Sequence, residues 1–420
     1  MSDNLQRYRL LQSFLPPPSQ RRLLLLTGAR QTGKTTLVKA SYPDLRYINL
    51  DAPENREMLA GLPTAAWGRD VGNAIIDEAQ KEPVVFEKTK YAWDEGSIAF
   101  GALLGSSQIL LLERIRESLA GRITLFELWP LLMRELRLPG EEQAPCGPPL
   151  LDQLLEGVPA GTVLADLPSV TMGREMLAAW EAEEHLLRWG GMPALLPLAA
   201  ADRWQWLRDY EHTYLERDLG DLARLRDLAP FRKLQRLAAL RSASLLNYSE
   251  LARDAAIGVD SSRRYLEYLR LSYQVVLIQP FHENLTSALV KTPKLYWLDL
   301  GLLRSLSGQL EGLTGSLYET MVVGEILKWV RTARKRAELF FYRTRSGLEV
   351  DLLVEQPSGI LAVEVKGRAV VTATDVRPMQ ELAARLGRRW LGGLVVYRGK
   401  SLQQVAAPDI WAMPSHRLLG

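Results

Sequence analysis

The stretch RRLLLLTGARQTGKTTLVKA, residues 21–40, decides how the first part of the chain folds. Its leucines at 23–26 predict a short strand of the buried type. The pattern Gly-x-x-x-x-Gly-Lys-Thr follows at residues 28–35, and a helical pattern resumes over residues 36–40. A strand, a glycine-rich turn and a helix in this order are typical of the phosphate-binding loop, or P-loop.

The residue types in this loop suit a bound phosphate chain. Glycines let backbone N–H groups close around an anion, and the helix N-terminus adds a partial positive charge. We expect Lys34 to reach the β- and γ-phosphates, and the Thr35 hydroxyl to bind Mg²⁺. The alternative is a glycine-rich turn that matches by accident. The residues assigned to nucleotide binding are Gly28, Ala29, Arg30, Gln31, Thr32, Gly33, Lys34, Thr35 and Thr36.

A second signal follows at residues 74–78, where a short apolar run ends in Asp77 and Glu78. This is the Walker B arrangement, in which Asp77 would hold Mg²⁺ and Glu78 would orient or deprotonate the attacking water. Alone, such a pair would equally suit a helix N-cap or a turn. Behind a P-loop, it favours a nucleotide site.

Two weaker candidates belong to the same region. Ser106 ends a third apolar run, where a sensor of the γ-phosphate could sit, and a capped turn is an equal alternative. Arg122 could be an arginine finger or a sensor, and a solvent-facing arginine is the alternative. The spacing does not decide either case.

Five segments resemble, in order, the AAA-type ATPase core of a widespread prokaryotic family. They are GARQTGKTTL (28–37), NLD (49–51), AIIDEAQKEP (74–83), LLGSSQ (103–108) and ESLAGRITLFELWPL (117–131). The resemblance covers most of residues 20–135, and members of that family usually carry a C-terminal domain of unknown function. It implies ATP with Mg²⁺, because nothing like a guanine-specifying Asn-Lys-x-Asp motif is present.

The middle of the chain divides into a connection and a helical module. Residues 138–168 are rich in Pro and Gly, which predicts an extended connection inside a first domain of residues 1–200. Residues 201–310 then show two helical patterns and two strand-like runs, the order of a winged helix. Its second helix carries Arg263, Arg264 and Arg270, which could contact DNA phosphates. Winged helices also dock proteins, so both partners stay open.

Two strands near the C-terminus gather charged residues. Glu349 and Asp351 share one face of the first strand, and Glu364 and Lys366 share one face of the next. Carboxylates in such a corner can hold Mg²⁺ against a phosphate, with the lysine beside the attacking water. A salt bridge between Glu364 and Lys366 is the alternative, worth at most about 1 kcal/mol if exposed.

An acid on one strand, followed by a hairpin and the pattern Glu-x-Lys on the next strand, resembles the PD-(D/E)xK nuclease fold. The resemblance covers residues 311–420. The resemblance implies that Asp351, Glu364 and Lys366 are catalytic, and that Glu319, Asp351 and Glu364 bind the metal. Val350 stands where that pattern has proline, and Glu349 is an acid that the pattern does not need. Fold alone does not establish cleavage. Residues 331–345 add a net charge of +5, a candidate phosphate-tracking surface.

Composition limits the remaining classes. The chain has 420 residues, with 52 basic and 49 acidic side chains, so a nucleic-acid surface must be a local patch. One cysteine excludes an intrachain disulfide and a Cys-rich zinc site. No apolar run reaches the roughly 20 residues of a membrane span, and no signal peptide begins the chain. We therefore expect a cytoplasmic protein.

The predicted fold class is α/β. It comprises a P-loop AAA-type ATPase core, a helical and winged-helix module, and a restriction-endonuclease-like α/β domain. The leading prediction is an ATPase coupled to nucleic-acid binding or processing. Its rivals are an ATP-dependent protein-interaction switch with a silent nuclease-like domain, and a DNA-binding module without turnover. The candidate partners are ATP, DNA and a second copy of the chain, with no membrane.

Overall fold

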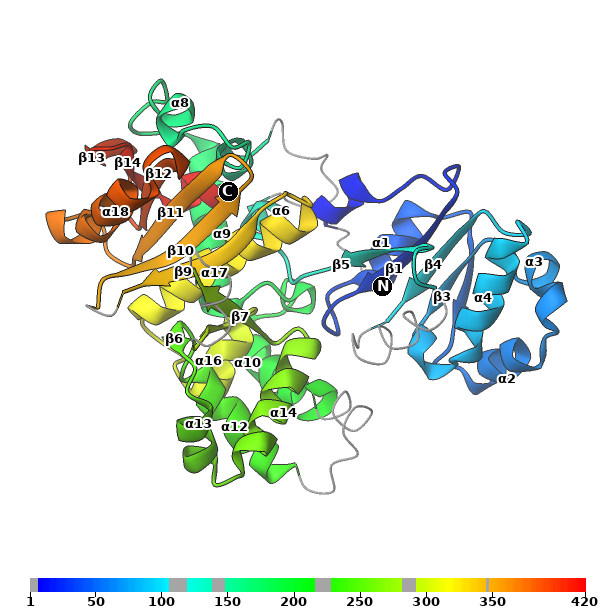
Figure 1. The fold of residues 1–420 in the computed structure, drawn as a ribbon. Helices are drawn as coiled ribbons and strands as arrows, with labels where there is room; N and C mark the ends of the chain where they lie inside the picture. Colours follow the sequence, from blue (N-terminus) through cyan, green and yellow to red (C-terminus); the bar gives the residue numbers. More distant parts are fainter. Residues whose placement is uncertain (1–6, 106–118, 138–147, 216–227, 282–291, 345–346) are drawn as a thin grey trace.

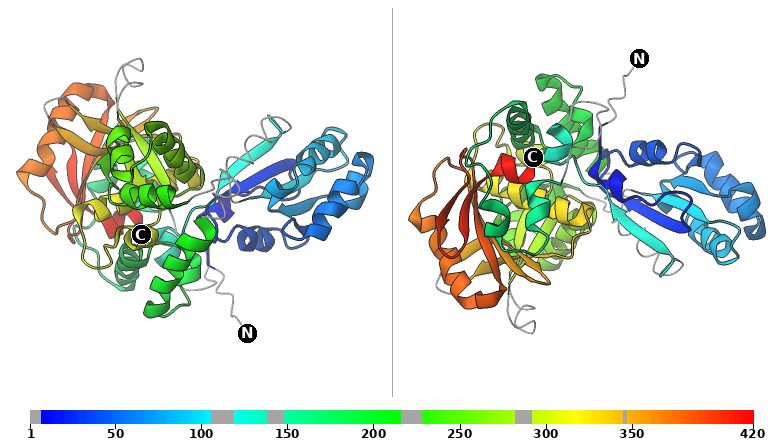
Figure 2. Two further views of the ribbon diagram at one scale, coloured as in Figure 1. Left: turned by 90° about the horizontal axis from the view of Figure 1, so that it is seen from below. Right: turned by 90° about the horizontal axis from the view of Figure 1, so that it is seen from above.

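The computed structural model describes residues 7–105, 119–137, 148–215, 228–281, 292–344 and 347–420. The chain forms two lobes that lie side by side (Figure 1). The first lobe holds the blue and cyan elements, and the second holds the elements coloured from green to red. The two further views in Figure 2 show the same division.

The first lobe is built on a parallel sheet with the strand order β2-β3-β4-β1-β5. Its strands are β1 (Arg22–Thr27), β2 (Arg46–Asn49), β3 (Ala74–Asp77), β4 (Phe100–Leu104) and β5 (Ile123–Glu127). Leu23 and Leu25 belong to one hydrophobic cluster, whereas Leu24 and Leu26 belong to another. Since successive residues of a strand face opposite sides, β1 is buried on both faces, and this explains its unbroken leucines.

Helices cover both faces of this sheet. The α-helices are α1 (Lys34–Ser41), α2 (Pro53–Gly61), α3 (Trp67–Asp70) and α4 (Val84–Asp94), and the 3₁₀ helices are η1 (Leu10–Phe14), η2 (Thr64–Ala66) and η3 (Ala79–Lys81). Helix α1 packs against Leu24 and Leu26. Helices α2 to α4 join the cluster of Leu23 and Leu25. Both faces of the sheet are therefore covered by helices, so a binding site can form only at the ends of the strands.

The described part of the connection, residues 148–168, is not extended as its Pro and Gly content suggested. It contains α7 (Leu150–Leu154) and α8 (Ala160–Leu164), whose leucines belong to the core of the second lobe. The N–H of Gly161 also donates to Asp409 Oδ2 at 2.9 Å. Prolines 149 and 159 each lie directly before a helix, where a missing N–H costs nothing. Residues 138–147 lie outside the described part.

Helices dominate the middle of the second lobe. They are α6 (Met133–Arg137), α9 (Arg174–Trp189), η4 (Pro193–Leu195), α10 (Ala200–Tyr210), the π-helical turn η5 (Glu211–Leu215), α12 (Ala229–Ala239), α13 (Tyr248–Ala255), α14 (Val259–Leu271) and α16 (Leu300–Ser307). Asn247 is the N-cap of helix α13, and its side chain accepts from the N–H groups of Ser249 and Glu250. This cap sets the start of the pair α13–α14.

A nine-stranded sheet runs through the second lobe in the order β13-β14-β12-β11-β10-β9-β7-β8-β6. Its strands are β6 (Ser244–Leu245), β7 (Val275–Pro280), β8 (Lys294–Trp297), β9 (Glu338–Arg343), β10 (Glu349–Gln356), β11 (Gly359–Lys366), β12 (Trp390–Tyr397), β13 (Gln403–Ala406) and β14 (Ile410–Pro414). Strand β7 pairs in parallel with β9 through Gln279 and Phe340. The hairpin β7–β8 is therefore continuous with the C-terminal sheet.

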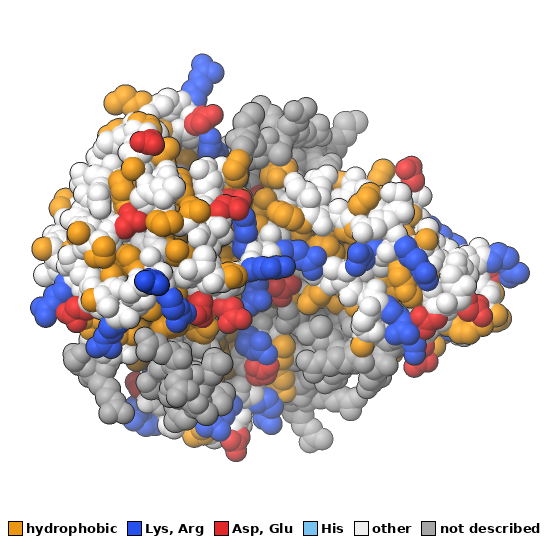
Figure 3. All heavy atoms as spheres, turned by 45° about the horizontal axis from the view of Figure 1, so that its top comes forward, with side chains coloured by type: hydrophobic (Ala, Val, Ile, Leu, Met, Phe, Trp, Pro, Cys, Tyr) orange, Lys and Arg blue, Asp and Glu red, His pale blue; other side chains and the backbone are white. Residues whose placement is uncertain are grey.

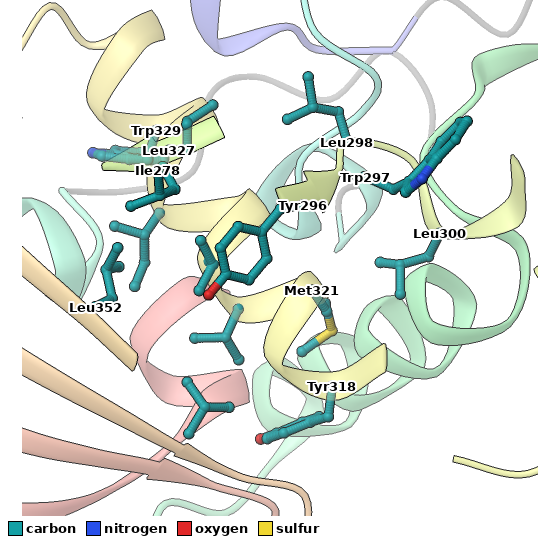
Figure 4. Packing of buried hydrophobic residues seen from close by; sticks show 14 of the residues in the cluster. Ile278, Tyr296, Trp297, Leu298, Leu300, Tyr318, Met321, Leu327, Trp329 and Leu352 are labelled. Atoms are coloured by element: carbon teal, nitrogen blue, oxygen red, sulfur yellow. The ribbon is translucent and has the colours of Figure 1, made fainter. Parts of the chain in front are cut away.

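Helix α17 (Gly315–Thr332) is the buried centre of this lobe. Figure 4 shows Met321 of α17 in one cluster with Tyr296 of β8 and Leu352 of β10. The other C-terminal helices are α18 (Ala373–Leu386), η6 (Gly387–Arg389) and α19 (Ser415–Leu419). Because α17 contacts both β8 and β11, it holds the hairpin and the C-terminal strands in a fixed relation.

The surface shows no single dominant charge on the face drawn in Figure 3, where Lys and Arg side chains are mixed with Asp and Glu. This agrees with the nearly even charge balance of the whole chain. Within the described ranges, no helix combines the length and the apolar character that crossing a bilayer requires.

One buried acid joins α9 to the C-terminus. Glu183 Oε2 accepts a hydrogen bond of 2.8 Å from Ser415 Oγ, and the nearest cation, Arg398 Nε, lies 3.9 Å from Glu183 Oε1. Burial raises the pKa of Glu183 from 4.5 to about 7, because these partners compensate the desolvation only in part. The carboxyl group is therefore held in its protonated form more readily than in the unfolded chain.

This pKa predicts a pH dependence of stability. Between pH 4.5 and 7 the folded state keeps a proton that the unfolded state releases, so the free energy of unfolding should fall as the pH rises through this window. Glu183→Gln should flatten this part of the curve. Urea unfolding of both proteins from pH 4.5 to 8 measures the difference, and parallel curves would contradict the assignment. Glu181→Gln is the matched control, because Glu181 is an exposed acid of the same helix.

Candidate functional site

The predicted P-loop connects β1 to α1. Gly33 has φ +90° and Gly28 has φ +150°, a region that side chains rarely adopt. A Cβ on Gly28 would also lie 2.2 Å from the carbonyl oxygen of Leu128, so only glycine fits there. The loop is thus formed by backbone that approaches β5 closely.

Lys34 is the first residue of α1 and is buried, with 8% exposure. Its Nζ donates to the carbonyl oxygens of Gly28 and Ala29, each at 2.9 Å. The ammonium group therefore lies against the inner side of the loop, where a P-loop lysine meets the β- and γ-phosphates.

Thr35 and Asp77 come together although 42 residues separate them. The Thr35 hydroxyl donates to Asp77 Oδ2 at 2.6 Å, and the Tyr47 hydroxyl donates to the same oxygen at 2.9 Å. The cause is the parallel sheet, in which β1 and β3 end at one edge. A hydroxyl and a carboxylate in contact are hard oxygen ligands, so this pair fits Mg²⁺.

Glu78 directly follows β3 at the same edge. Its backbone is left-handed, with φ +53°, which is uncommon for a residue with a side chain. The Gln80 side chain donates to Glu78 Oε2 at 2.5 Å and holds the carboxylate. Backbone strain of this kind persists where the surroundings impose it, often in active sites.

The other loop residues contribute mainly backbone. Thr32 is buried and its hydroxyl donates to Ala29 O at 2.9 Å, whereas Thr36 is exposed in the first turn of α1. Gln31 has φ +63° and Arg30 offers its carbonyl to a tyrosine described below. Ser106 lies outside the described residues.

Arg122 lies away from this cluster. It directly precedes β5, and Ile123 pairs with Leu23 at the amino end of β1, whereas the P-loop follows the carboxyl end. The guanidinium binds both oxygens of Asp94, at 2.7 and 3.1 Å. The structure does not bring Arg122 to the nucleotide loop of its own chain, and its role as an arginine finger or a sensor stays a prediction.

Three residues outside residues 20–137 support the loop and the strand before it, and no local sequence pattern predicts them. Arg9 donates to the carbonyl oxygens of Thr32 and Trp129, both at 2.6 Å. Tyr210 of α10 donates to Arg30 O at 3.1 Å. Tyr273, between α14 and β7, bonds through its hydroxyl to Thr27 Oγ1 at 2.5 Å.

Among these three residues, Tyr273 is held by several interactions of different kinds. It has φ +60°, its ring packs edge-on against Trp129 at 5.2 Å, and its hydroxyl also donates to Glu127 Oε1 at 3.3 Å. Thr27 and Glu127 are the last residues of β1 and β5. The second lobe therefore touches the nucleotide edge of the first.

A second cluster of charges lies at the C-terminal sheet. Asp351 of β10 accepts a hydrogen bond from the N–H of Val365 at 2.9 Å, and Lys366 Nζ donates to Glu364 Oε1 at 2.5 Å. Burial raises the pKa of Glu364 to about 8, and the charge of Asp351 adds to this effect. Burial likewise raises the pKa of Glu319, on α17, to about 7. The four residues predicted from the sequence are thus neighbours.

Lys294 of β8 completes the cluster and was missed. Its Nζ lies 2.5 Å from Glu349 Oε1, 3.2 Å from Glu319 Oε1 and 3.4 Å from Asp351 Oδ1. Tyr296, two residues on, donates to Glu319 Oε1 at 2.7 Å. The sequence does contain a signal for it, since Lys294 begins the apolar run KLYWL. A charged side chain in a buried strand needs partners of opposite charge.

This arrangement does not fit a divalent ion as it stands. An ammonium group already lies between the carboxylates of Glu319, Glu349 and Asp351. In the described part of the chain, no group of three or more His, Cys, Asp or Glu side chains is placed to hold a metal ion. The metal-binding roles of Glu319, Asp351 and Glu364 stay predictions.

The basic segment 331–345 is partly committed to internal contacts. Lys335 pairs with Asp152 at 2.9 Å, Arg343 pairs with Glu349 at 3.2 Å, and Arg334 donates to Leu125 O at 3.0 Å. Arg345 lies outside the described residues. The segment therefore presents fewer unpaired charges than its composition suggested.

The parallel sheet of the first lobe, with a glycine-rich loop between β1 and α1, resembles the core of a P-loop ATPase. Three family models match the chain: "AAA domain" over residues 20–137, "Domain of unknown function (DUF8612)" over 181–312 and "Domain of unknown function (DUF4143)" over 314–418. Residues 20–137 therefore match an AAA-type P-loop ATPase domain, and this match supports ATP binding.

Similar proteins and structures carry little functional information. Uncharacterized proteins of Mycobacterium bovis and Mycobacterium tuberculosis are each 29% identical over 355 residues, which cover 82% of this chain and 70% of theirs. A Walker-type ATPase of Pyrococcus abyssi is 17% identical, with a TM-score of 0.39 over 72% of this chain and 96% of its own. A STAND protein of Pyrococcus horikoshii has a TM-score of 0.25 over 78% and 46%.

The position of Arg122 yields a prediction. Arg122→Ala should leave the ATP affinity of the isolated chain unchanged, because the guanidinium lies at the edge of the sheet opposite to Lys34. Isothermal titration calorimetry measures the affinity. Arg21→Ala is the matched control, since Arg21 is another exposed arginine near α4, stacked on Trp93. A loss of affinity in Arg122→Ala alone would place this residue at the nucleotide.

Proposed function

We propose that the protein is a Mg²⁺-dependent ATPase whose hydrolysis cycle is coupled to nucleic-acid binding by the second lobe. One observation carries the ATPase part of the proposal. Lys34, Thr35, Asp77 and Glu78 lie together at the carboxyl edge of the first sheet, and this arrangement supports phosphoryl transfer to water.

Each residue has a defined task in this proposal. The loop N–H groups and the N-terminus of α1 bind the phosphates, and Lys34 neutralises their charge. Thr35 and Asp77 would hold Mg²⁺, which when bound neutralises the β- and γ-phosphate oxygens. Glu78 orients the attacking water and accepts its proton. Gln80 fixes the Glu78 carboxylate through the hydrogen bond described above.

Coupling to the second lobe would pass through two tyrosines. Tyr210 holds Arg30 of the loop, and Tyr273 holds Thr27 directly before it. Tyr273 lies between α14 and β7, so a change in the loop is transmitted to that helix and that strand. Two sites that bias one shared element are coupled, and each affects the other equally.

The segment from α12 to β8 is proposed to be a winged helix. Its order of helix, short strand, two helices and a hairpin is that of the winged-helix class, and β6 and β7 both pair with β8. Arg263 and Arg264 of α14 are exposed, and Arg270 pairs with Glu267 at 2.5 Å. Exposed arginines on the last helix of such a unit suit DNA phosphates.

The C-terminal segment is proposed to have a PD-(D/E)xK nuclease-like fold. Its order α17, β9, β10, β11, α18, β12 supports this, together with the placement of Asp351, Glu364 and Lys366 on adjacent strands. A second candidate function follows from Lys294. Its position among the acids favours an ATP-dependent protein-interaction switch in which the nuclease-like domain is silent.

The ATPase proposal is tested by two substitutions. Lys34→Ala removes a charged donor to the phosphates, worth about 1.5–3 kcal/mol, and should weaken ATP binding about tenfold or more. Glu78→Gln should keep ATP affinity and slow hydrolysis about 100-fold or more. Calorimetry and phosphate release measure the two effects. Lys90→Ala, on α4, is the control, and equal ATP affinity for wild type and Lys34→Ala would reject the site.

The nucleic-acid part is tested on α14. If Arg263 and Arg264 contact phosphates, replacing both with Ala should weaken duplex binding and reduce the slope of log K against log salt by about one unit for each lost contact. Fluorescence anisotropy at several salt concentrations measures the slope. Arg253→Ala, an exposed residue of α13, is the control. An unchanged slope would favour the protein-interaction switch.

A further inference from the structure

The C-terminal acid cluster holds a buried cation of its own, in a different lobe from the ATPase site. Three carboxylates, those of Glu319, Glu349 and Asp351, point at Lys294 Nζ from a helix and a strand. The Lys294 side chain is only 4% exposed. Burial alone would lower the pKa of Lys294, but the surrounding acids raise it, so the ammonium stays charged.

The ammonium group is held in place by its backbone. Lys294 pairs with Ile278 of β7 on one side and with Leu245 of β6 on the other. Its Nζ also lies 5.6 Å from the centre of the Phe341 ring, within the range of a cation–π contact. A surface lysine moves freely, whereas this one is positioned from both neighbouring strands.

The oxygens of the acids are largely satisfied without a metal. Tyr296 donates to Glu319, the Val365 N–H donates to Asp351, and Arg343 pairs with Glu349. Lys366 pairs with one oxygen of Glu364. The other oxygen, Glu364 Oε2, is buried and has no hydrogen-bond partner among the described residues.

Lys294 and the acids come from different parts of the chain. Lys294 lies in the segment that matches DUF8612, and the acids lie in the segment that matches DUF4143. The hairpin β7–β8 therefore brings its own cation to the neighbouring domain. A divalent ion at the same carboxylates would meet an ammonium within a few ångströms, and two cations that close repel strongly in a buried site.

We propose that Lys294 is the resident cation of this cluster and takes the place of a divalent metal ion. Mg²⁺ requires several oxygens in octahedral geometry at about 2.0–2.1 Å, and the oxygens that would provide them are engaged by Lys294. The C-terminal domain then keeps its structure without metal. Removing the ammonium should convert the cluster into a divalent-cation site.

The test measures Mn²⁺ binding in the full chain without nucleotide, by electron paramagnetic resonance. Asp77→Asn is present in every protein, so that the ATPase site does not contribute. With Lys294 in place, we expect no saturable Mn²⁺ binding at micromolar concentrations. Lys294→Met should gain one Mn²⁺ site, and a further Asp351→Asn substitution should remove it.

Two results would overturn the proposal. One is a Mn²⁺ site in the protein with Lys294 that Asp351→Asn abolishes. The other is a folded Lys294→Met protein without any Mn²⁺ site. If Lys294→Met does not fold, Lys294→Met with Glu319→Gln is measured instead, because it carries one uncompensated acid fewer. Lys328→Met is the matched control, since Lys328 is also buried and paired, with Glu325, and should gain no site.

Discussion

The burial of β1 on both faces is the constraint on which the nucleotide edge depends. A strand covered by two hydrophobic clusters can vary neither its register nor its direction, so Thr27 and the loop after it have a fixed position. The carboxyl ends of β3 and β5 are set by the same sheet, which brings Asp77 and Glu127 to that edge. The contacts of Tyr273 with Thr27 and Glu127 are possible only because of this alignment.

Features that depend on short stretches of sequence could be predicted. The class of the first lobe follows from the loop with its flanking strand and helix, and a parallel sheet then places Thr35 beside Asp77. The neighbourhood of Glu364 and Lys366 follows from the two-residue period of a strand. In each case, the physical cause acts within one element or between strands of known direction.

The remaining features depend on pairings between distant segments. Tyr273 meets Thr27 across 246 residues, and Lys294 meets Asp351 across 57. No periodicity encodes such contacts. The position of Arg122 could not be predicted either. The residues around it do not indicate whether it lies at the amino or the carboxyl edge of the sheet. The Pro- and Gly-rich connection looked extended because the hydrophobic core that orders α7 and α8 comes from the far end of the chain.

The pairing of β7 with β9 determines where the chain can be divided into stable fragments. A cut at residue 311, where the predicted nuclease-like domain begins, would remove β7 from the side of β9 and leave an open strand edge in solvent. It would also discard Lys294 and leave three carboxylates to repel one another. The smallest fragment with an intact sheet must retain β6, so it begins no later than residue 244.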